Sequence, residues 1–299
     1  MPARFAAYPS DSAALIRVLD EDTHYRIGRS SDCEICLAHR SISRFHAELS
    51  GGGEQWRLQD TGSKNGLSVE GRITRRAELA SSTWFMIGDV YCSFEPMDAS
   101  ASAAYEADDN KRRATARALS MQLRPNLGVG TLIPQALDMV LQLTGLERGF
   151  VLYASNGDPL RVRATRGLNV EDLARKQFAG SAAAVERALE SGEQIVCCET
   201  GDSPWLGTRP SVKLGGIRSL LCIPLTLGGR ARGVVYADSR KPGPPITELD
   251  IELVENVTRQ ASAAIEAARF EDRIADVLRN AASIGVQPPA WEELRPAMA

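Results

Sequence analysis

The sequence predicts a multidomain protein in which an all-β sandwich is followed by an α+β domain. At 299 residues, the chain has room for two domains of ordinary size. Between about residues 13 and 97, short apolar runs alternate with frequent turn residues, a pattern typical of a β-sandwich. From about residue 129 onward, strand-like runs are mixed with stripes of helical period, which favours an α+β fold.

The candidate strands of the first region are short apolar or alternating runs. They lie at residues 15–19, 45–49, 56–58, 67–69, 84–87 and 90–94. Turn residues separate them, above all in the segment 60–66, where the pair Asn65-Gly66 readily adopts positive φ. Strands of this length with loops at their ends are what a sandwich requires.

Residues 98–128 form a predicted linker with a helical middle. The segment opens with small and polar residues and continues with a basic run between Lys111 and Arg124. Pro125 and Gly128 interrupt any helix that would continue through them. Such a basic run is more often a solvated helix face than a nucleic-acid patch.

The second region mixes predicted strands with predicted helices. Strands are expected at 149–153, 160–164, 220–225 and 233–237, a turn at Asn156-Gly157, and helices at 132–143 and 181–191. A long final helix is expected to start at Thr247, a suitable N-cap. Ile246 and Ile251 are placed to form a hydrophobic staple at that start.

Composition excludes several classes of protein. Hydrophobic residues at 43% and charged residues at 24% exclude wholesale disorder. A net charge of −3 argues against a broad nucleic-acid-binding surface. No run approaches the roughly 18 consecutive apolar residues that span a membrane, and residues 1–19 lack the pattern of a secretory leader. Six cysteines are too few for a disulfide-stapled secreted domain, so we expect a cytoplasmic protein without membrane or nucleic-acid partners.

Three segments of the first region concentrate groups that suit a phosphorylated ligand: 28–30, 41–46 and 63–66. A phosphoryl group carries nearly two negative charges and three strong acceptor oxygens. Arg29 and Arg44 offer charge and forked donors, and Ser43 can add a hydroxyl donor. The Asn65 amide can both donate and accept toward a peptide backbone.

The order and spacing of four motifs resemble the forkhead-associated (FHA) domain. They are Gly28-Arg29-Ser30, Ser43-Arg44-Phe45-His46, the segment from Asp60 to Gly66, and Ile87-Gly88-Asp89. The resemblance implies an FHA/SMAD-like sandwich that binds phosphothreonine peptides through its loops. Carried over by position, Arg29 and Ser43 would contact the phosphate, with Arg44 and Lys64 beside it. Asn65 would hold the peptide backbone.

The resemblance also assigns supporting residues around this site. His46 would brace the loops without contacting the ligand, and Gly28 and Gly66 would support the site. The sequence departs from the family at Lys64, where threonine is frequent, and at Glu70, where asparagine often precedes the second glycine. The first departure affects local contacts and the second affects only a turn.

Residues from about 129 to 270 resemble a GAF domain. The resemblance rests on three core segments and on the closing helix: 146–150, 217–225, 233–239 and 261–270. It implies a central antiparallel sheet and a module that binds a small molecule or pairs with a second copy. The Asn-Lys, Phe and Asp-Glu signature of the cyclic-nucleotide subgroup is missing, since the Asn110-Lys111 pair lies in the linker.

The final helix carries a stripe at alternating three- and four-residue steps. Its members are Ile251, Val254, Thr258, Ala261, Ile265 and Ala268. Such a stripe suits a partner helix and hence a homodimer, or it packs on its own sheet. Trp205 and Arg218 can line a cavity, or serve as a buried aromatic and a surface charge.

Other candidate chemistries lack their partners. Cys33 and Cys36 have redox-like spacing, but no βαβ pattern surrounds them and no second pair exists for zinc. Cys197 and Cys198 have no nearby histidine, and the three histidines all lie in the first region. We therefore expect no enzyme activity, no metal and no cofactor.

We predict a non-catalytic, bacterial-style signalling adaptor. Its predicted domains are the FHA domain at 13–97, the linker at 98–128, the GAF domain at 129–270, and a C-terminal helix extension with a flexible tail at 271–299. The expected partner is a phosphothreonine-containing protein modified by an upstream Ser/Thr kinase, and the GAF module serves dimerisation or sensing. The alternative is a small-molecule sensor, in which the FHA domain acts only in localisation or autoinhibition.

One further possibility involves the chain's own linker. A phosphorylated threonine such as Thr115 would occupy the FHA site from within the same chain.

Overall fold

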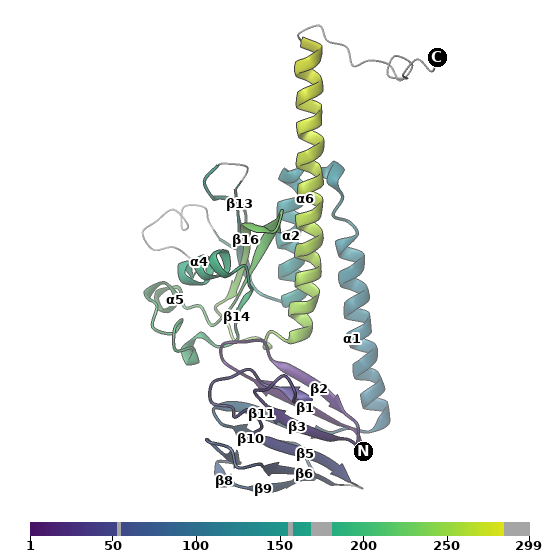
Figure 1. The fold of residues 1–299 in the computed structure, drawn as a ribbon, viewed down its shortest axis with the longest axis vertical. Helices are drawn as coiled ribbons and strands as arrows, with labels where there is room; N and C mark the ends of the chain where they lie inside the picture. The colour runs from purple at the N-terminus through teal and green to yellow at the C-terminus, as the bar shows by residue number, and fades with distance from the viewer. Residues whose placement is uncertain (53–54, 155–157, 169–180, 284–299) are drawn as a thin grey trace, which may run out of the picture.

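The computed structural model describes residues 1–52, 55–154, 158–168 and 181–283. It contains a β-sandwich, a linker helix and an α+β domain from which a long helix extends (Figure 1). The predicted turn at Asn156-Gly157 lies outside the described residues.

Two packed sheets form the N-terminal sandwich. One has the strand order β2-β1-β11-β10-β7-β8 and the other β4-β3-β5-β6-β9. The strands are β1 (Ala3–Tyr8), β2 (Leu15–Leu19), β3 (His24–Gly28), β4 (Ile35–Cys36), β5 (Ala47–Gly52), β6 (Gln55–Asp60), β7 (Leu67–Val69), β8 (Arg72–Thr74), β9 (Arg76–Leu79), β10 (Thr83–Ile87) and β11 (Val90–Pro96). Their inward side chains form one core, to which β6 contributes Trp56 and Leu58 in alternation with exposed neighbours.

Strand β1 was not among the strands that the sequence pattern predicted. It pairs with β2 on one side and β11 on the other, so it lies inside the sheet. Its small residues Ala3, Ala6 and Ala7 are fully buried, although alanine has little strand preference. The two flanking strands supply the backbone pairing that stabilises it.

The predicted linker folds into one long helix, α1 (Ala99–Ser120), followed by the short η1 (Pro125–Leu127). Asp98 caps α1, because its carboxylate accepts from the amide of Ala101 at 2.7 Å. Two members of the basic run are paired with α6 (Glu248–Ser283): Arg112 bonds Asp250, and Arg113 bonds Glu252 at 3.2 Å. The basic face is therefore partly used inside the molecule.

A five-stranded antiparallel sheet forms the centre of the C-terminal domain, in the order β13-β12-β16-β15-β14. Its strands are β12 (Arg148–Tyr153), β13 (Arg161–Arg166), β14 (Ile195–Cys197), β15 (Ser219–Leu227) and β16 (Arg230–Ser239). The helices are α2 (Val129–Thr144), α4 (Ala182–Ser191), η2 (Thr200–Asp202), α5 (Pro210–Gly215) and α6. The β-sandwich and the α+β domain with its central antiparallel sheet confirm the predicted fold class.

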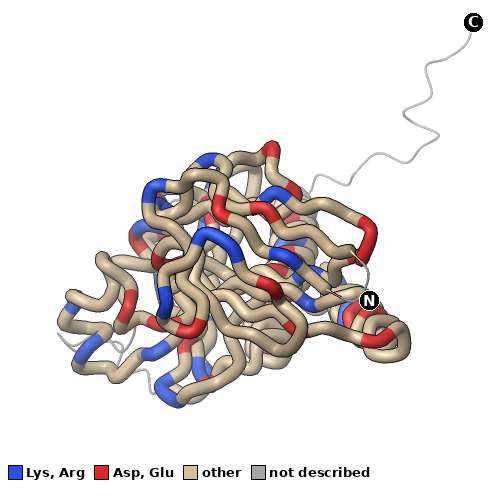
Figure 2. Tube along the Cα trace, turned by 90° about the horizontal axis from the view of Figure 1, so that it is seen from below, with Lys and Arg blue, Asp and Glu red and all other residues tan. Residues whose placement is uncertain are grey.

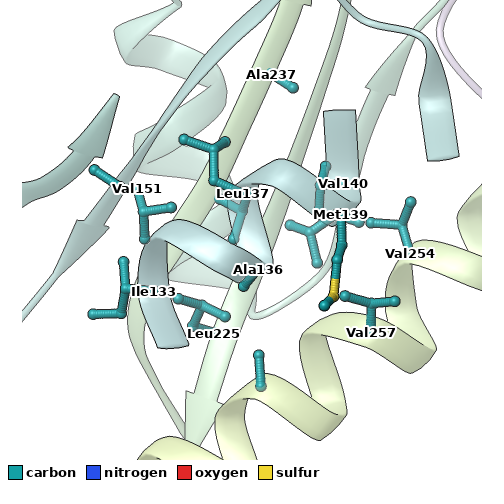
Figure 3. Packing of buried hydrophobic residues seen from close by; sticks show 14 of the residues in the cluster. Ile133, Ala136, Leu137, Met139, Val140, Val151, Leu225, Ala237, Val254 and Val257 are labelled. Atoms are coloured by element: carbon teal, nitrogen blue, oxygen red, sulfur yellow. The ribbon is translucent and has the colours of Figure 1, made fainter. Parts of the chain in front are cut away.

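Helices cover both faces of this sheet. α2 and α6 lie on one face, and α4 and α5 lie on the other (Figure 1). Figure 3 shows the first layer, where Met139 and Val140 of α2 point toward Val254 and Val257 of α6. A separate cluster on the opposite face contains Phe150 and the other apolar side chains beneath α4 and α5.

The start of α6 follows its predicted capping pattern. The Thr247 hydroxyl accepts from the amide of Asp250 at 3.1 Å, and the Thr247 amide donates to the Asp250 carboxylate at 2.7 Å. The stripe predicted to pair with another helix is buried within the domain itself, where none of its members is more than 8% exposed: Ile251, Val254, Thr258, Ala261, Ile265 and Ala268. The stripe was expected either to pair with a partner helix or to pack on its own sheet, and the structure shows the second arrangement.

The two domains meet where β2 approaches the start of α6. The Ala14 amide donates to the Ile246 carbonyl at 2.7 Å, and the Glu248 amide donates to the Ala14 carbonyl at 2.9 Å. Arg17 and Glu248 form an ion pair at 2.7 Å. Within the described part of the chain, no helix combines the length and apolar character needed to cross a bilayer.

Candidate functional site

The three loop segments predicted to bind phosphate are hydrogen-bonded to one another. The amide of Arg29 donates to the carbonyl of Ser43 at 2.9 Å, and that of Ser30 donates to the carbonyl of Arg44 at 3.1 Å. The Lys64 amide donates to the Ser43 hydroxyl oxygen at 3.0 Å. These bonds join residues 14 to 21 positions apart in the sequence. We call the segments 28–30, 41–46 and 63–66 the loop cluster.

Gly28 permits the close approach of the first two loops. A Cβ atom at this position would lie 2.1 Å from the Arg44 carbonyl oxygen and 2.9 Å from the Cys33 sulfur. The buried Cys33 thiol donates to the same carbonyl at 3.3 Å. Any side chain at Gly28 would therefore push the loops apart, because the closest obstacle is backbone.

His46 lies fully buried behind the loops and joins two of them. Its Nδ1 accepts from the Ser43 amide at 3.1 Å, and its Nε2 contacts the Gly66 carbonyl oxygen at 3.0 Å. Because Nδ1 is an acceptor and a carbonyl accepts only, the neutral ring carries its hydrogen on Nε2. His46 has no exposed surface for a ligand.

Asn65 is tied to the segment that precedes Ser43. Its side-chain Nδ2 donates to the Ser41 carbonyl at 2.7 Å, while the residue as a whole stays exposed. The amide oxygen and the second amide hydrogen remain for a ligand. Gly66, the neighbouring residue, accepts from the Gly88 amide at 3.1 Å, which fastens this loop to the β10–β11 turn.

Ser41 is a positioning residue that the sequence analysis did not single out. It is buried, its carbonyl accepts from Asn65, and its hydroxyl oxygen accepts from the Asp89 amide at 2.9 Å. A Cβ atom at Gly88 would lie 2.7 Å from Ser41. The segment 41–46 and the Ile87-Gly88-Asp89 motif contained the two sides of this contact, but nothing local indicated the positioning role of Ser41.

The loop cluster carries positive charge without a counter-charge. Arg29, Arg44 and Lys64 are exposed, and none of them forms an ion pair within the described residues. Arg29 donates from Nε to the Ile42 carbonyl at 3.2 Å, which leaves both terminal nitrogens available. By contrast, nearby Arg26 is bound to Glu34 at 2.8 Å.

The Ser43 hydroxyl completes the donor set. Its oxygen accepts from the Lys64 amide, so its own hydrogen is still available to a ligand oxygen. Two guanidinium groups, one ammonium, one hydroxyl and one carboxamide therefore belong to a single hydrogen-bonded group of loops. Such a set can hold a tetrahedral dianion and a flanking peptide amide.

Charge elsewhere on this end of the molecule is mixed. Figure 2, seen from the side of the sandwich, shows Lys and Arg interspersed with Asp and Glu. Arg4 with Glu95 and Arg26 with Glu34 are paired examples. Within the described residues, Arg57 and Arg76 of the same domain are also exposed and without an ion pair, so the loop cluster differs in that its cations share hydrogen-bonded loops with the Ser43 hydroxyl.

The other candidates from the sequence occupy ordinary structural positions. Arg187 lies over the ring of Trp205 at 4.9 Å, and the exposed Arg218 pairs with Glu199 at 2.8 Å. The Thr115 hydroxyl donates to the Lys111 carbonyl within α1 at 2.9 Å. The described residues contain no group of three or more His, Cys, Asp or Glu side chains arranged to hold a metal ion.

All six cysteines are free thiols. Burial raises the pKa of Cys197 to about 12 and that of Cys198 to about 11, which disfavours the reactive thiolate. Burial likewise raises the pKa of Cys33. These environments are those of packing residues.

Comparison with known proteins identifies both domains. Family models match the FHA domain to residues 25–88 and the GAF domain to residues 129–265. Domains of both types are typically regulatory, and neither match indicates an enzyme family. A search of curated proteins found no match.

Solved structures similar to this chain include members of both families. An FHA domain from Chlamydia trachomatis is 26% identical, with 33% of this chain and 100% of that chain covered and a TM-score of 0.31. Mycobacterium tuberculosis EmbR in complex with a phosphopeptide is 26% identical, with 31% and 24% covered and a TM-score of 0.28. A GAF domain/HD domain protein from Geobacter sulfurreducens is 14% identical, with 48% and 94% covered and a TM-score of 0.38. The two family models show that the chain contains an FHA domain followed by a GAF domain.

Proposed function

We propose that this protein is a non-catalytic signalling adaptor that binds phosphothreonine in partner proteins through its loop cluster. Arg29 and Ser43 bind the phosphate, Arg44 and Lys64 add charge beside it, and Asn65 bonds the peptide backbone. One observation carries the proposal: exposed cations without counter-charges share a hydrogen-bonded group of loops with a free hydroxyl donor.

Charge and hydrogen bonding together explain the selectivity for the modified residue. A phosphorylated threonine brings close to two negative charges and three acceptor oxygens, whereas the unmodified hydroxyl brings neither. The Arg29 fork can form two parallel bonds to such a group, and charge-assisted bonds are about twice as strong as neutral ones. Binding therefore depends on an upstream Ser/Thr kinase.

The remaining parts of the chain support the phosphothreonine-binding FHA domain. We assign the FHA module to residues 13–97 together with β1 (Ala3–Tyr8), which lies inside its sheet, the linker to 98–128, the GAF domain to 129–270 and an extension to 271–299. The GAF domain acts in dimerisation or in sensing of a small molecule, and two FHA sites in one homodimer raise avidity. Free thiols at all six cysteines fit a reducing compartment, which supports the cytoplasm.

A phosphothreonine peptide library, with the unmodified peptides as reference, tests the proposal. Arg29→Ala should weaken binding at least about thirtyfold, because a buried charged contact is worth about 2–5 kcal/mol. Arg57→Ala is the matched control, since Arg57 is an exposed arginine on β6 of the same domain. Full binding by Arg29→Ala, or equal binding of unmodified peptides, would overturn the assignment.

A second screen separates this function from the sensor alternative. Thermal unfolding of the full chain is followed with phosphopeptide and with a panel of metabolites. Stabilisation by phosphopeptide supports phosphothreonine binding by the FHA domain. Stabilisation by a metabolite alone would support small-molecule sensing by the GAF domain.

A further inference from the structure

The C-terminal half of α6 presents a bare apolar face. Phe270 is 63% exposed, Ile274 45% and Val277 66%, at steps of four and three residues. Figure 1 shows this part of the helix rising clear of the rest of the domain. Apolar residues at such steps are the pattern of a two-helix seam.

The same face continues toward the start of α6 but changes in character. Ala263 and Ala267 extend the bare face with small side chains. Further back, Asn256 and Gln260 line a groove of about 400 Å³ beside α1, which ends at Ser120. The face is thus flanked by α1 in its first part and open in its second part. It is distinct from the stripe of Ile251 to Ala268, which the domain core already uses.

A second groove runs along α6 on the side that faces β15, away from α1. It measures about 560 Å³ and lies between α6 and β15, lined by Ala263, Glu266, Pro224 and Gly228 among others. The bare face therefore combines protruding apolar side chains at one end with small residues and grooves at the other. Two antiparallel copies of α6 would place the protruding apolar side chains of each copy against the small residues and grooves of the other.

We propose that α6 pairs with α6 of a second copy of this chain in antiparallel orientation, centred between Ala267 and Phe270. In this register Phe270 packs on the partner's Ala267, and Ile274 packs on the partner's Ala263. Each contact sets a large side chain against a small one, and the two-fold axis repeats it. A parallel pair would instead stack Phe270 on Phe270 and Ala267 on Ala267, as in-register seams do.

Charge selects the same register. Residues 266 and 273 flank the seam on one side, and the antiparallel pair sets Glu266 beside the partner's Arg273 twice. A parallel pair would set Glu266 beside the partner's Glu271. An antiparallel pair shifted by one heptad would oppose either two Arg273 or two Glu266 side chains. Neither Glu266 nor Arg273 has an ion pair within the residues that the structure describes, so both are available.

This arrangement determines how far apart the two FHA domains lie. Glu248, at the start of α6, contacts the FHA domain through Arg17. It is about 20 residues from the proposed two-fold axis, so the two helix starts are about 60 Å apart at 1.5 Å per residue. If the proposed function holds and the two loop clusters are separated by a distance of this order, a single peptide needs about 18 extended residues between its two sites to bind both copies. The dimer therefore favours bridging two partner molecules.

Charge reversal in the full chain tests the orientation. The mass is measured by sedimentation velocity over a range of concentrations, with a monomer of 32.4 kDa as reference. Glu266→Arg and Arg273→Glu should each weaken the dimer about tenfold or more, and the double variant should regain most of the affinity. Both residues are exposed, so folding should be unchanged.

Two further variants separate the seam from general surface effects. Phe270→Ser should dissociate the dimer, whereas Ile73→Ser, at a residue 90% exposed on the FHA domain, should not. Single-site phosphopeptide affinity should be the same for all variants, so a failure of dimerisation is distinguishable from a failure of phosphopeptide binding. A monomeric wild type, or a dimer tightened by Glu266→Arg as a parallel pair requires, would overturn the proposal.

Discussion

Replacing His46 by alanine should loosen the whole loop cluster, although every residue proposed to bind the ligand is still present. The imidazole is fully buried and bonds the Ser43 amide and the Gly66 carbonyl. Alanine leaves the Ser43 amide without a partner in the interior, which costs about 1–3 kcal/mol, while the Gly66 carbonyl keeps its bond from the Gly88 amide. We therefore expect His46→Ala to lower the free energy of unfolding of the FHA domain by about 2 kcal/mol.

Urea denaturation followed by tryptophan fluorescence measures this loss, to which Trp56 responds because it lies in the sandwich core. Phosphopeptide titration of the still-folded variant gives the effect on the site, where we expect a loss of affinity because Ser43 is no longer positioned. His46→Asn retains an acceptor on a short side chain and should lose less. His24→Ala is the control, because His24 is exposed and its loss should cost at most about 0.5 kcal/mol. A cost below about 1 kcal/mol for His46→Ala, with full binding, would refute the bracing role.

Three other predictions follow from the geometry. Gly28→Ala should lower the free energy of unfolding by about 2 kcal/mol or more and impair phosphopeptide binding, because its Cβ would lie 2.1 Å from the Arg44 carbonyl oxygen. Denaturation curves that match those of the wild type would contradict this. Glu70→Asn should stabilise the FHA domain by about 0.5–1 kcal/mol, since Glu70 has φ 49° and asparagine tolerates that region better; no gain in thermal unfolding would count against it. Glu34 is bonded by Arg26, which lowers the pKa of its carboxyl to about 2, so its contribution to stability is present above its ordinary pKa of 4.5 and is lost as the pH falls toward 2. Stability curves of Glu34→Gln should flatten in that window, and an NMR titration midpoint near 4.5 would disprove the pairing.

Much of the candidate site was predictable because its members belong to short motifs. The segments that contain Arg29, Ser43 and Asn65 each carry local turn chemistry that can be recognised within a few residues. Ser41 could not be found in this way, since its role depends on contacts with Asn65 and Asp89, which are 24 and 48 residues away. The same limit applied to β1, whose alanines become a strand only between β2 and β11.

The sequence by itself determined the two domain types, the order of the loop motifs and the start of α6 at Thr247. These features depend on interactions between residues close along the chain, such as capping bonds, turns and alternating burial. The tertiary structure alone decided which face of α6 is free. A periodic stripe identifies apolar residues on one side of a helix, but only packing decides whether the chain's own sheet or another molecule covers them. Here the domain core takes the predicted stripe, and the seam from Ala263 to Val277 remains open.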